Sequence, residues 1–105
     1  MLTRNENGAA ETFLLGTRNN FIGMMKNNSF ASDTFQMKKD DYLFIYSDGV
    51  NELLTPDNKI MNQQEFLLSV KDFGPRSLDE LLMHLRDKQK DQVFTDDCSI
   101  IKIIV

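Results

Sequence analysis

Three acidic side chains of the sequence stand next to apolar runs that have the character of buried strands. Asp48 follows the run 42–47, "YLFIYS", and Asp96 and Asp97 precede the run 98–105, "CSIIKIIV". If these strands are antiparallel neighbours, the end of one meets the start of the other, and the carboxylates come to one edge of the sheet. Carboxylates gathered there repel each other unless a cation lies between them, and oxygen ligands suit Mg²⁺ or Mn²⁺ better than zinc.

The same residues also have an ordinary structural interpretation. Asp48-Gly49 is one of the common turn dipeptides, and Thr95-Asp96-Asp97 could simply begin a loop. Two or three carboxylates also form only part of a two-metal centre, which needs further oxygen ligands. At this level the metal site and the pair of turns both remain open.

The N-terminal part of the sequence predicts a hairpin, a long loop and a strand. The turn-forming letters "NENG" separate two short extended runs near the start of the chain. The stretch 16–33 has the composition of a loop, with one apolar cluster inside it. Phe35 and Met37 alternate with polar residues, which is typical of a half-buried strand over 33–38.

Two helices are predicted between the runs 42–47 and 98–105. The first begins near Asn62, which can cap it, with Glu65 three residues later, and "FGP" ends it. The second begins with a capping box formed by Ser77 and Glu80. Its apolar residues recur at the spacing of one helical face. They are Leu78, Leu81, Leu82 and Leu85.

These elements predict an α+β fold in which strands 42–47 and 98–105 are central. Both strands are apolar on both faces, which is typical of a sheet that is covered on both sides. Two helices can cover only one face. We therefore expect the other face to be covered by another sheet, by an upstream part of the polypeptide, or by a second subunit in a homodimer.

Composition excludes several classes of function. The 105 residues suffice for one small domain, and the net charge of −4, with no basic cluster longer than Lys38-Lys39, argues against nucleic-acid or anionic-membrane partners. No apolar run approaches the roughly 18 residues that span a bilayer. The single cysteine, Cys98, excludes an internal disulfide, fits a reducing cytoplasm and is interpreted as an inert buried thiol.

Two other groups of titratable residues are given structural interpretations. Asp40 and Asp41 precede strand 42–47, so they lie at the opposite end from Asp48 and are expected to form a turn. His84 lies at the border of the leucine face of the second helix, and we expect a solvated helix residue there.

The segment from Lys39 to Val105 resembles the C-terminal half of the metal-dependent serine/threonine phosphatases of the protein phosphatase 2C type. The resemblance is greatest to the bacterial branch typified by stage II sporulation protein E and stress-response phosphatases. That branch has a strand ending in Asp-Gly-Val with Glu two residues later, and this chain has "YSDGVNE". The branch also has Asp-Asp-x-Thr before a final apolar strand, and this chain has "TDDCSIIKIIV", with Ser99 for Thr. Upstream, "NNFIGMM" is similar to a loop around a Leu-Gly pair, with Ile22-Gly23 in its place.

The resemblance implies a fold and a set of site residues. The fold is an α-β-β-α sandwich of two antiparallel sheets with outer helices. Asp48 and Asp96 would bind metal in a binuclear Mn²⁺ or Mg²⁺ centre, Asp97 ranks third as a ligand, and Gly49 is the turn glycine of the motif. In that family a metal-bridged water attacks the phosphorus of a phosphoserine or phosphothreonine, so no separate catalytic side chain is implied.

The resemblance also shows a departure from the family pattern. The family carries an earlier Asp-Gly-x-x-Gly-type motif and another acidic ligand at its start, and the sequence before Asp48 has no such motif. We therefore expect residues 1–105 to be a single domain that forms the C-terminal part of a larger phosphatase domain and is inactive alone. The implied substrate is a phosphoprotein of bacterial signalling, such as an anti-sigma factor antagonist. The alternative is a non-catalytic module that presents its helices to a protein partner.

Overall fold

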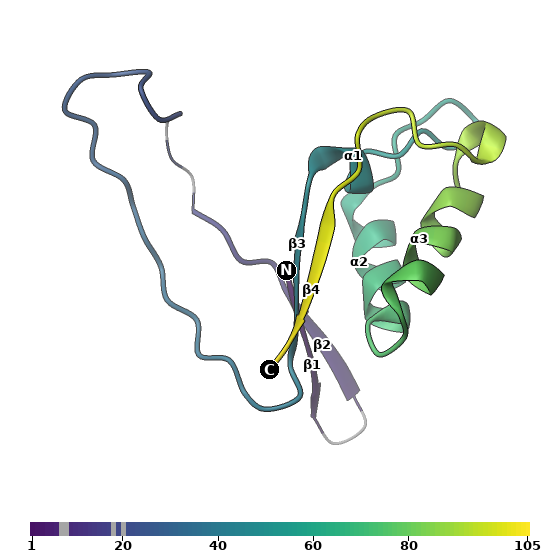
Figure 1. The fold of residues 1–105 in the computed structure, drawn as a ribbon, viewed down its shortest axis with the longest axis horizontal. Coiled ribbons are helices and arrows are strands. Elements are labelled where there is room, and N and C mark those ends of the chain that lie inside the picture. The colour runs from purple at the N-terminus through teal and green to yellow at the C-terminus, as the bar shows by residue number, and fades with distance from the viewer. Residues whose placement is uncertain (7–8, 18, 20) are drawn as a thin grey trace.

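The structure is a computed structural model that describes residues 1–6, 9–17, 19 and 21–105. Its four strands form one antiparallel sheet in the order β2-β1-β3-β4, with the helices on one side of it (Figure 1). The predicted α+β fold is confirmed. The strands are β1 (Leu2–Glu6), β2 (Ala9–Phe13), β3 (Tyr42–Tyr46) and β4 (Ile100–Ile104). The helices are α1 (Asp48–Asn51), α2 (Gln63–Phe73), α3 (Leu78–Asp87) and the 3₁₀ helix η1 (Lys90–Gln92).

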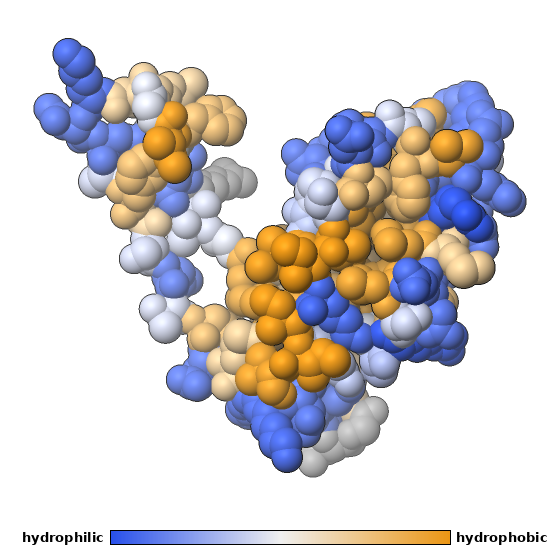
Figure 2. Space-filling model, viewed as in Figure 1, coloured by the Kyte–Doolittle hydropathy of each residue, from blue (hydrophilic) through white to orange (hydrophobic). Residues whose placement is uncertain are grey.

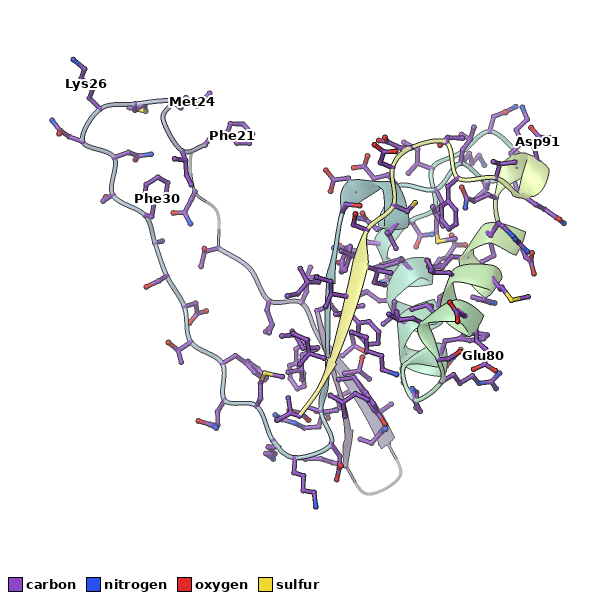
Figure 3. The ribbon with its side chains drawn as sticks, viewed as in Figure 1. Phe21, Met24, Lys26, Phe30, Glu80 and Asp91 are labelled. Carbon is purple, nitrogen blue, oxygen red and sulfur yellow. The ribbon has the colours of Figure 1, made fainter. Side chains whose placement is uncertain are left out.

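The N-terminal hairpin and the loop after it follow the prediction. Strands β1 and β2 pair antiparallel, and the residues expected to turn between them, 7 and 8, lie outside the described residues. The described residues of 16–33 are irregular. They form a long connection that arches away from the sheet, and exposed Phe21, Met24 and Phe30 lie at its far end (Figures 1 and 3).

The strand predicted over 33–38 is wrong. Phe35 and Met37 are half-buried, as their alternation indicated, but the segment pairs with no strand among the described residues. Phe35 packs instead against Phe13 of β2, with ring centroids 5.2 Å apart. The segment contacts the hairpin through its side chains. The alternation of apolar and polar residues in 33–38 therefore reflects this packing and not backbone pairing in a sheet.

Both predicted helices begin where their capping residues stand. The Asn62 side chain accepts a hydrogen bond from the Glu65 N–H at 2.9 Å. The Ser77 hydroxyl accepts one from the Glu80 N–H at 3.2 Å, and the Glu80 carboxylate accepts one from the Ser77 N–H, which completes the capping box. The apolar faces of these helices pack against the sheet. The buried core is Met1, Phe44, Val50, Leu53, Met61, Phe66, Val70, Leu81 and Leu85.

The second face of the sheet is not covered by the described residues near β3 and β4. Phe44 points into the helical core, whereas Ile45, Ile101 and Ile103 on the opposite face are 53%, 57% and 42% exposed. Figure 2 shows the resulting run of hydrophobic surface over β4. No second sheet is formed within the described residues, and the covering of this face stays a prediction. No helix of the described residues is long and apolar enough to cross a membrane.

A buried ion pair fastens the return of the long loop to the hairpin. Arg4 donates hydrogen bonds from Nε and Nη2 to the two carboxylate oxygens of Asp41, at 2.9 and 2.7 Å, and the Lys38 N–H donates a third at 2.7 Å. The Asp41 side chain is only 2% exposed. The hydrogen bonds from Arg4, followed by that from Lys38, hold the pKa of Asp41 below its ordinary value against the opposing effect of burial. Asp41 thus belongs to the turn before β3, as expected, and also anchors it.

Replacing this carboxylate should destabilise the fold in a pH-dependent way. Because the pKa of Asp41 is lowered by folding, its contribution is fully present above the unfolded-state pKa of about 4 and is lost as the pH falls through the lower folded-state value. We expect Asp41→Asn to lower the urea midpoint at pH 7 and to flatten the acid side of the stability profile. Urea titrations from pH 3 to 7 test this, with exposed Asp33→Asn as control; equal midpoints for Asp41→Asn and wild type would contradict it.

Candidate metal centre

The end of β3 and the start of β4 lie side by side, as chain direction predicted. Tyr46 pairs with Ile100 in the antiparallel ladder. Beyond this pair, the Ser47 N–H donates to the Ser99 carbonyl at 2.9 Å and the Ser99 N–H donates to the Ser47 hydroxyl oxygen at 3.0 Å. The Ser47 hydroxyl also donates to the Asp97 carbonyl at 3.3 Å. Ser47, the residue before Asp48, is therefore hydrogen-bonded directly to the Asp97 peptide and to Ser99.

Gly49 lies against the backbone of that segment. A Cβ atom at this position would lie 2.2 Å from the Asp97 carbonyl oxygen and 2.9 Å from its carbon. Both contacts are closer than Cβ atoms are found to approach other atoms, so only glycine fits. The Cys98 thiol adds a hydrogen bond to the Gly49 carbonyl at 3.0 Å. The glycine of the Asp-Gly-Val motif thus allows two peptide segments to touch, and it is buried at the start of the short helix α1 rather than in a left-handed turn.

The three predicted ligands occupy the rim of this contact and are exposed. Asp48 is the first residue of α1, with Ser47 as its N-cap residue. The Asp96 carboxylate accepts a hydrogen bond from the Asp97 N–H at 2.7 Å, which orients Asp96 locally. The structure therefore joins the two motifs through their backbones and leaves their carboxylates in solvent.

The charges of these carboxylates act on neighbouring groups. Burial raises the pKa of the Cys98 thiol, and the negative charges of Asp96 and Asp97 raise it further. Burial likewise raises the pKa of Tyr46, with a smaller contribution from Asp48. A thiol with a raised pKa is a poor nucleophile. The raised pKa of the half-buried Cys98 supports the expectation of an inert thiol, and the aspartate segment beside it is negatively charged.

The fit of a metal ion to this edge is partial. Carboxylate oxygens are the ligands that Mg²⁺ and Mn²⁺ prefer, and the backbone brings Asp48 next to Asp96 and Asp97. The described residues nevertheless contain no group of three or more His, Cys, Asp or Glu side chains arranged to hold a metal ion. This edge can therefore supply part of an all-oxygen ligand set, and the assignment of Asp48, Asp96 and Asp97 as ligands stays a prediction.

His84 lies elsewhere and is less solvated than predicted. It is half-buried on α3, its ring stacks on Phe73 with centroids 4.2 Å apart, and its Nε2 lies 3.3 Å from the Ser69 hydroxyl. Burial lowers the pKa of this histidine, with a further contribution from Lys88. These contacts join α3 to α2, so His84 is part of the helix packing and not of the edge that carries Asp48.

Ser47 is the residue that sequence reasoning overlooked. Its hydroxyl contacts the Ser99 N–H and the Asp97 carbonyl, so it positions both aspartate motifs. A serine between a buried strand and Asp-Gly is a recognisable helix-capping signal. The sequence therefore contained a signal that Ser47 ends the strand, but not that its hydroxyl reaches across to β4.

The antiparallel sheet with its helices on one face defines an α+β class of protein, in which the Asp-Gly-Val and Asp-Asp motifs are joined through their backbones. The family model described as Stage II sporulation protein E (SpoIIE) matches residues 1–105, and the chain therefore belongs to this family. The relationship supports a phosphatase-related function, and enzymes of this protein phosphatase 2C-like group are generally metal-dependent. No curated protein and no solved structure matches the chain in the corresponding comparisons.

Substituting Gly49 tests the contact between the two motifs. In Gly49→Ala the new methyl group meets the rigid backbone of Asp97, so α1 must move away from β4. We expect a loss in the free energy of unfolding at or above the upper end of the about 1–3 kcal/mol typical of overpacking. Chemical denaturation measures this loss. Gly16→Ala is the matched control, because a Cβ there has no atom within 4 Å; equal losses in both variants would contradict the contact.

Proposed function

We propose that this chain is the C-terminal part of a Mn²⁺- or Mg²⁺-dependent phosphoserine/phosphothreonine protein phosphatase that acts in bacterial signalling. The observation that carries the proposal is the contact between Gly49 and the Asp97 peptide, which brings two separate aspartate motifs to one edge. Membership of the SpoIIE family supports the class of reaction. The substrate would be a small cytoplasmic phosphoprotein, for example an anti-sigma factor antagonist.

The charge at this edge explains why a cation belongs to the proposal. Asp48, Asp96 and Asp97 present negative charge to solvent, and a phosphoserine dianion would be repelled by it. Asp48 and Asp96 would hold the metal ions, and Asp97 would support Asp96 through its N–H. The bound ions would supply Lewis-acid activation of water and neutralise the phosphate. Ser47 and Gly49 would act by fixing the distance between the two aspartate segments.

The proposal also holds that the described residues are insufficient for activity. They contain no complete group of metal ligands, and the sequence before Asp48 lacks the Asp-Gly-x-x-Gly-type motif of the phosphatases it resembles. The remaining ligands would come from upstream polypeptide. The chain would then form the second half of a larger phosphatase domain.

A Mn²⁺ titration tests the ligand assignment. We expect Mn²⁺ binding that weakens by at least about tenfold, or about 1.4 kcal/mol, in Asp48→Asn and in Asp96→Asn. Each substitution removes a carboxylate charge at nearly constant shape, and isothermal calorimetry measures the result. Asp72→Asn, an exposed aspartate on α2, is the control. Millimolar binding that is the same in all four proteins would show that the edge does not hold a metal ion.

Activity requires a longer chain to be tested. A polypeptide extended upstream into an Asp-Gly motif should hydrolyse a phosphoserine peptide only with Mn²⁺ or Mg²⁺ present. Asp48→Asn should abolish the phosphate release without lowering the melting temperature, because the side chain is exposed. Unchanged activity in Asp48→Asn would refute the proposed role.

A non-catalytic binding module is the second candidate function. The observation that favours it is the lack of a metal-holding group within the described residues. Met83, on α3, is 55% exposed and would be a contact residue for a protein partner. Absence of Mn²⁺ binding together with a natural reading frame that begins at Met1 would favour this candidate over the phosphatase.

A further inference from the structure

Strand β4 is an outer strand of the sheet. In the order β2-β1-β3-β4 it pairs with β3 on one side, and no described residue forms a strand on the other. An edge strand offers a row of unpaired N–H and C=O groups to which another strand can add. The sequence Ile100–Ile104 is apolar except for Lys102, so β4 combines an open edge with a hydrophobic character.

The hydrogen-bonding pattern fixes which backbone groups face outward. The Ser99 carbonyl and the Val105 N–H bond toward β3, to the Ser47 N–H and the Asp41 carbonyl. Backbone groups alternate in direction along an antiparallel strand, so those of Ile101 and Ile103 also point toward β3. The N–H and C=O groups of Ile100, Lys102 and Ile104 therefore point to the open edge.

Lysine commonly protects an edge strand from pairing, and the charge of Lys102 is already bound by groups on the helical face. Its amine donates a hydrogen bond to the Arg76 carbonyl at 2.7 Å and lies 4.7 Å from the centre of the Tyr42 ring. The charged group is thus held over the helical face of the sheet. On the other face, Ile101 and Ile103 are joined by exposed Val105 in a stripe of hydrophobic surface (Figure 2).

We propose that β4 pairs antiparallel with β4 of a second copy of this chain, about a two-fold axis at Ile103. A register centred on Lys102 would place two lysines directly opposite each other, which is unfavourable. Centring on Ile103 places each Lys102 opposite Ile104, and both have outward-pointing backbone groups, so these pairs exchange hydrogen bonds. The two sheets then form one continuous antiparallel sheet.

The same register joins the two hydrophobic stripes. Ile103 faces Ile103 of the second copy, and each Ile101 faces Val105, all on the face of the sheet that the helices leave open. A register centred on Ile101 instead places Ile103 opposite Ser99, which breaks the apolar stripe. The match between backbone direction and side-chain face is therefore specific to an axis at Ile103.

Side-chain variants test the stripe. Sedimentation velocity of the whole chain should show a concentration-dependent dimer, and Ile103→Lys should shift it to monomer by placing two charges face to face at the axis. Ile22→Lys is the matched control, because Ile22 is 93% exposed on the distant loop, and it should leave the dimer unchanged. A wild-type chain that remains monomeric up to hundreds of micromolar, or loss of the dimer in both variants, would overturn the proposal.

Backbone variants test the pairing itself. Ile104→Pro removes an outward N–H without removing a bond to β3, and proline is tolerated on the open side of an edge strand. Ile104→Ala keeps that N–H and removes more of the side chain than proline does, so it controls for the loss of apolar contact at this 63% exposed position. Circular dichroism should show both variants folded, with the dimer lost only in Ile104→Pro. A dimer that survives the proline would show that β4 does not pair in this way.

Amide exchange distinguishes a second copy from other occupants of the edge. In the proposed dimer, the Lys102 and Ile104 amides become protected as the chain concentration rises. Protection of these amides in a monomer of an upstream-extended chain would show that the polypeptide covers its own edge, and the proposal would be wrong. The test does not involve Asp48 or Asp96, so its result is separate from that of the metal titration.

Discussion

The contact between Gly49 and the Asp97 peptide is the constraint on which the candidate site depends. Without it, Asp48 and Asp96 would be two unrelated acidic residues separated along the chain. The contact needs glycine on one side, because any side chain would overlap the Asp97 carbonyl. It also needs the Ser47 hydroxyl, which bonds to both Ser99 and Asp97. Backbone fit therefore brings the two aspartate segments to one end of the sheet, where a bound cation would offset their negative charge.

The aspartates at the two ends of β3 have different electrostatic surroundings. At the start, Arg4 forms an ion pair with the buried carboxylate of Asp41, so the negative charge of Asp41 is balanced within the chain. At the end, the carboxylate of Asp48 is exposed, and the nearby Asp96 and Asp97 add further negative charge. The sequence places aspartate at both ends of one strand. Asp41 is buried and paired with Arg4, whereas Asp48 is exposed, and this difference distinguishes the structural aspartate from the candidate ligand.

Much of the fold could be predicted from local patterns, and the site could be predicted only in part. The caps at Asn62 and Ser77 are local signals, and both helices begin there. The approach of the Asp48 segment to the Asp96 segment was predicted on the condition that the two strands are antiparallel neighbours, and β3 and β4 do pair in this way. The segment around Phe35 was predicted as a strand because alternation reports a half-buried side-chain pattern and not a hydrogen-bonded ladder. The bond from Ser47 to Asp97 depends on a register between distant residues, which no local signal specifies.

The open features of the sheet require two different kinds of partner. The edge that carries Asp48 and Asp96 has excess negative charge, which a cation satisfies. The face that carries Ile45, Ile101 and Ile103 has excess apolar surface, which only another apolar surface satisfies. Asp96 and Asp97 precede β4, whereas the apolar stripe runs from Ile101 of β4 to Val105. A pairing centred on Ile103 uses residues 101–105, so it leaves the Asp96–Asp97 segment free. Strand addition along β4 and metal binding before its start can therefore occur together.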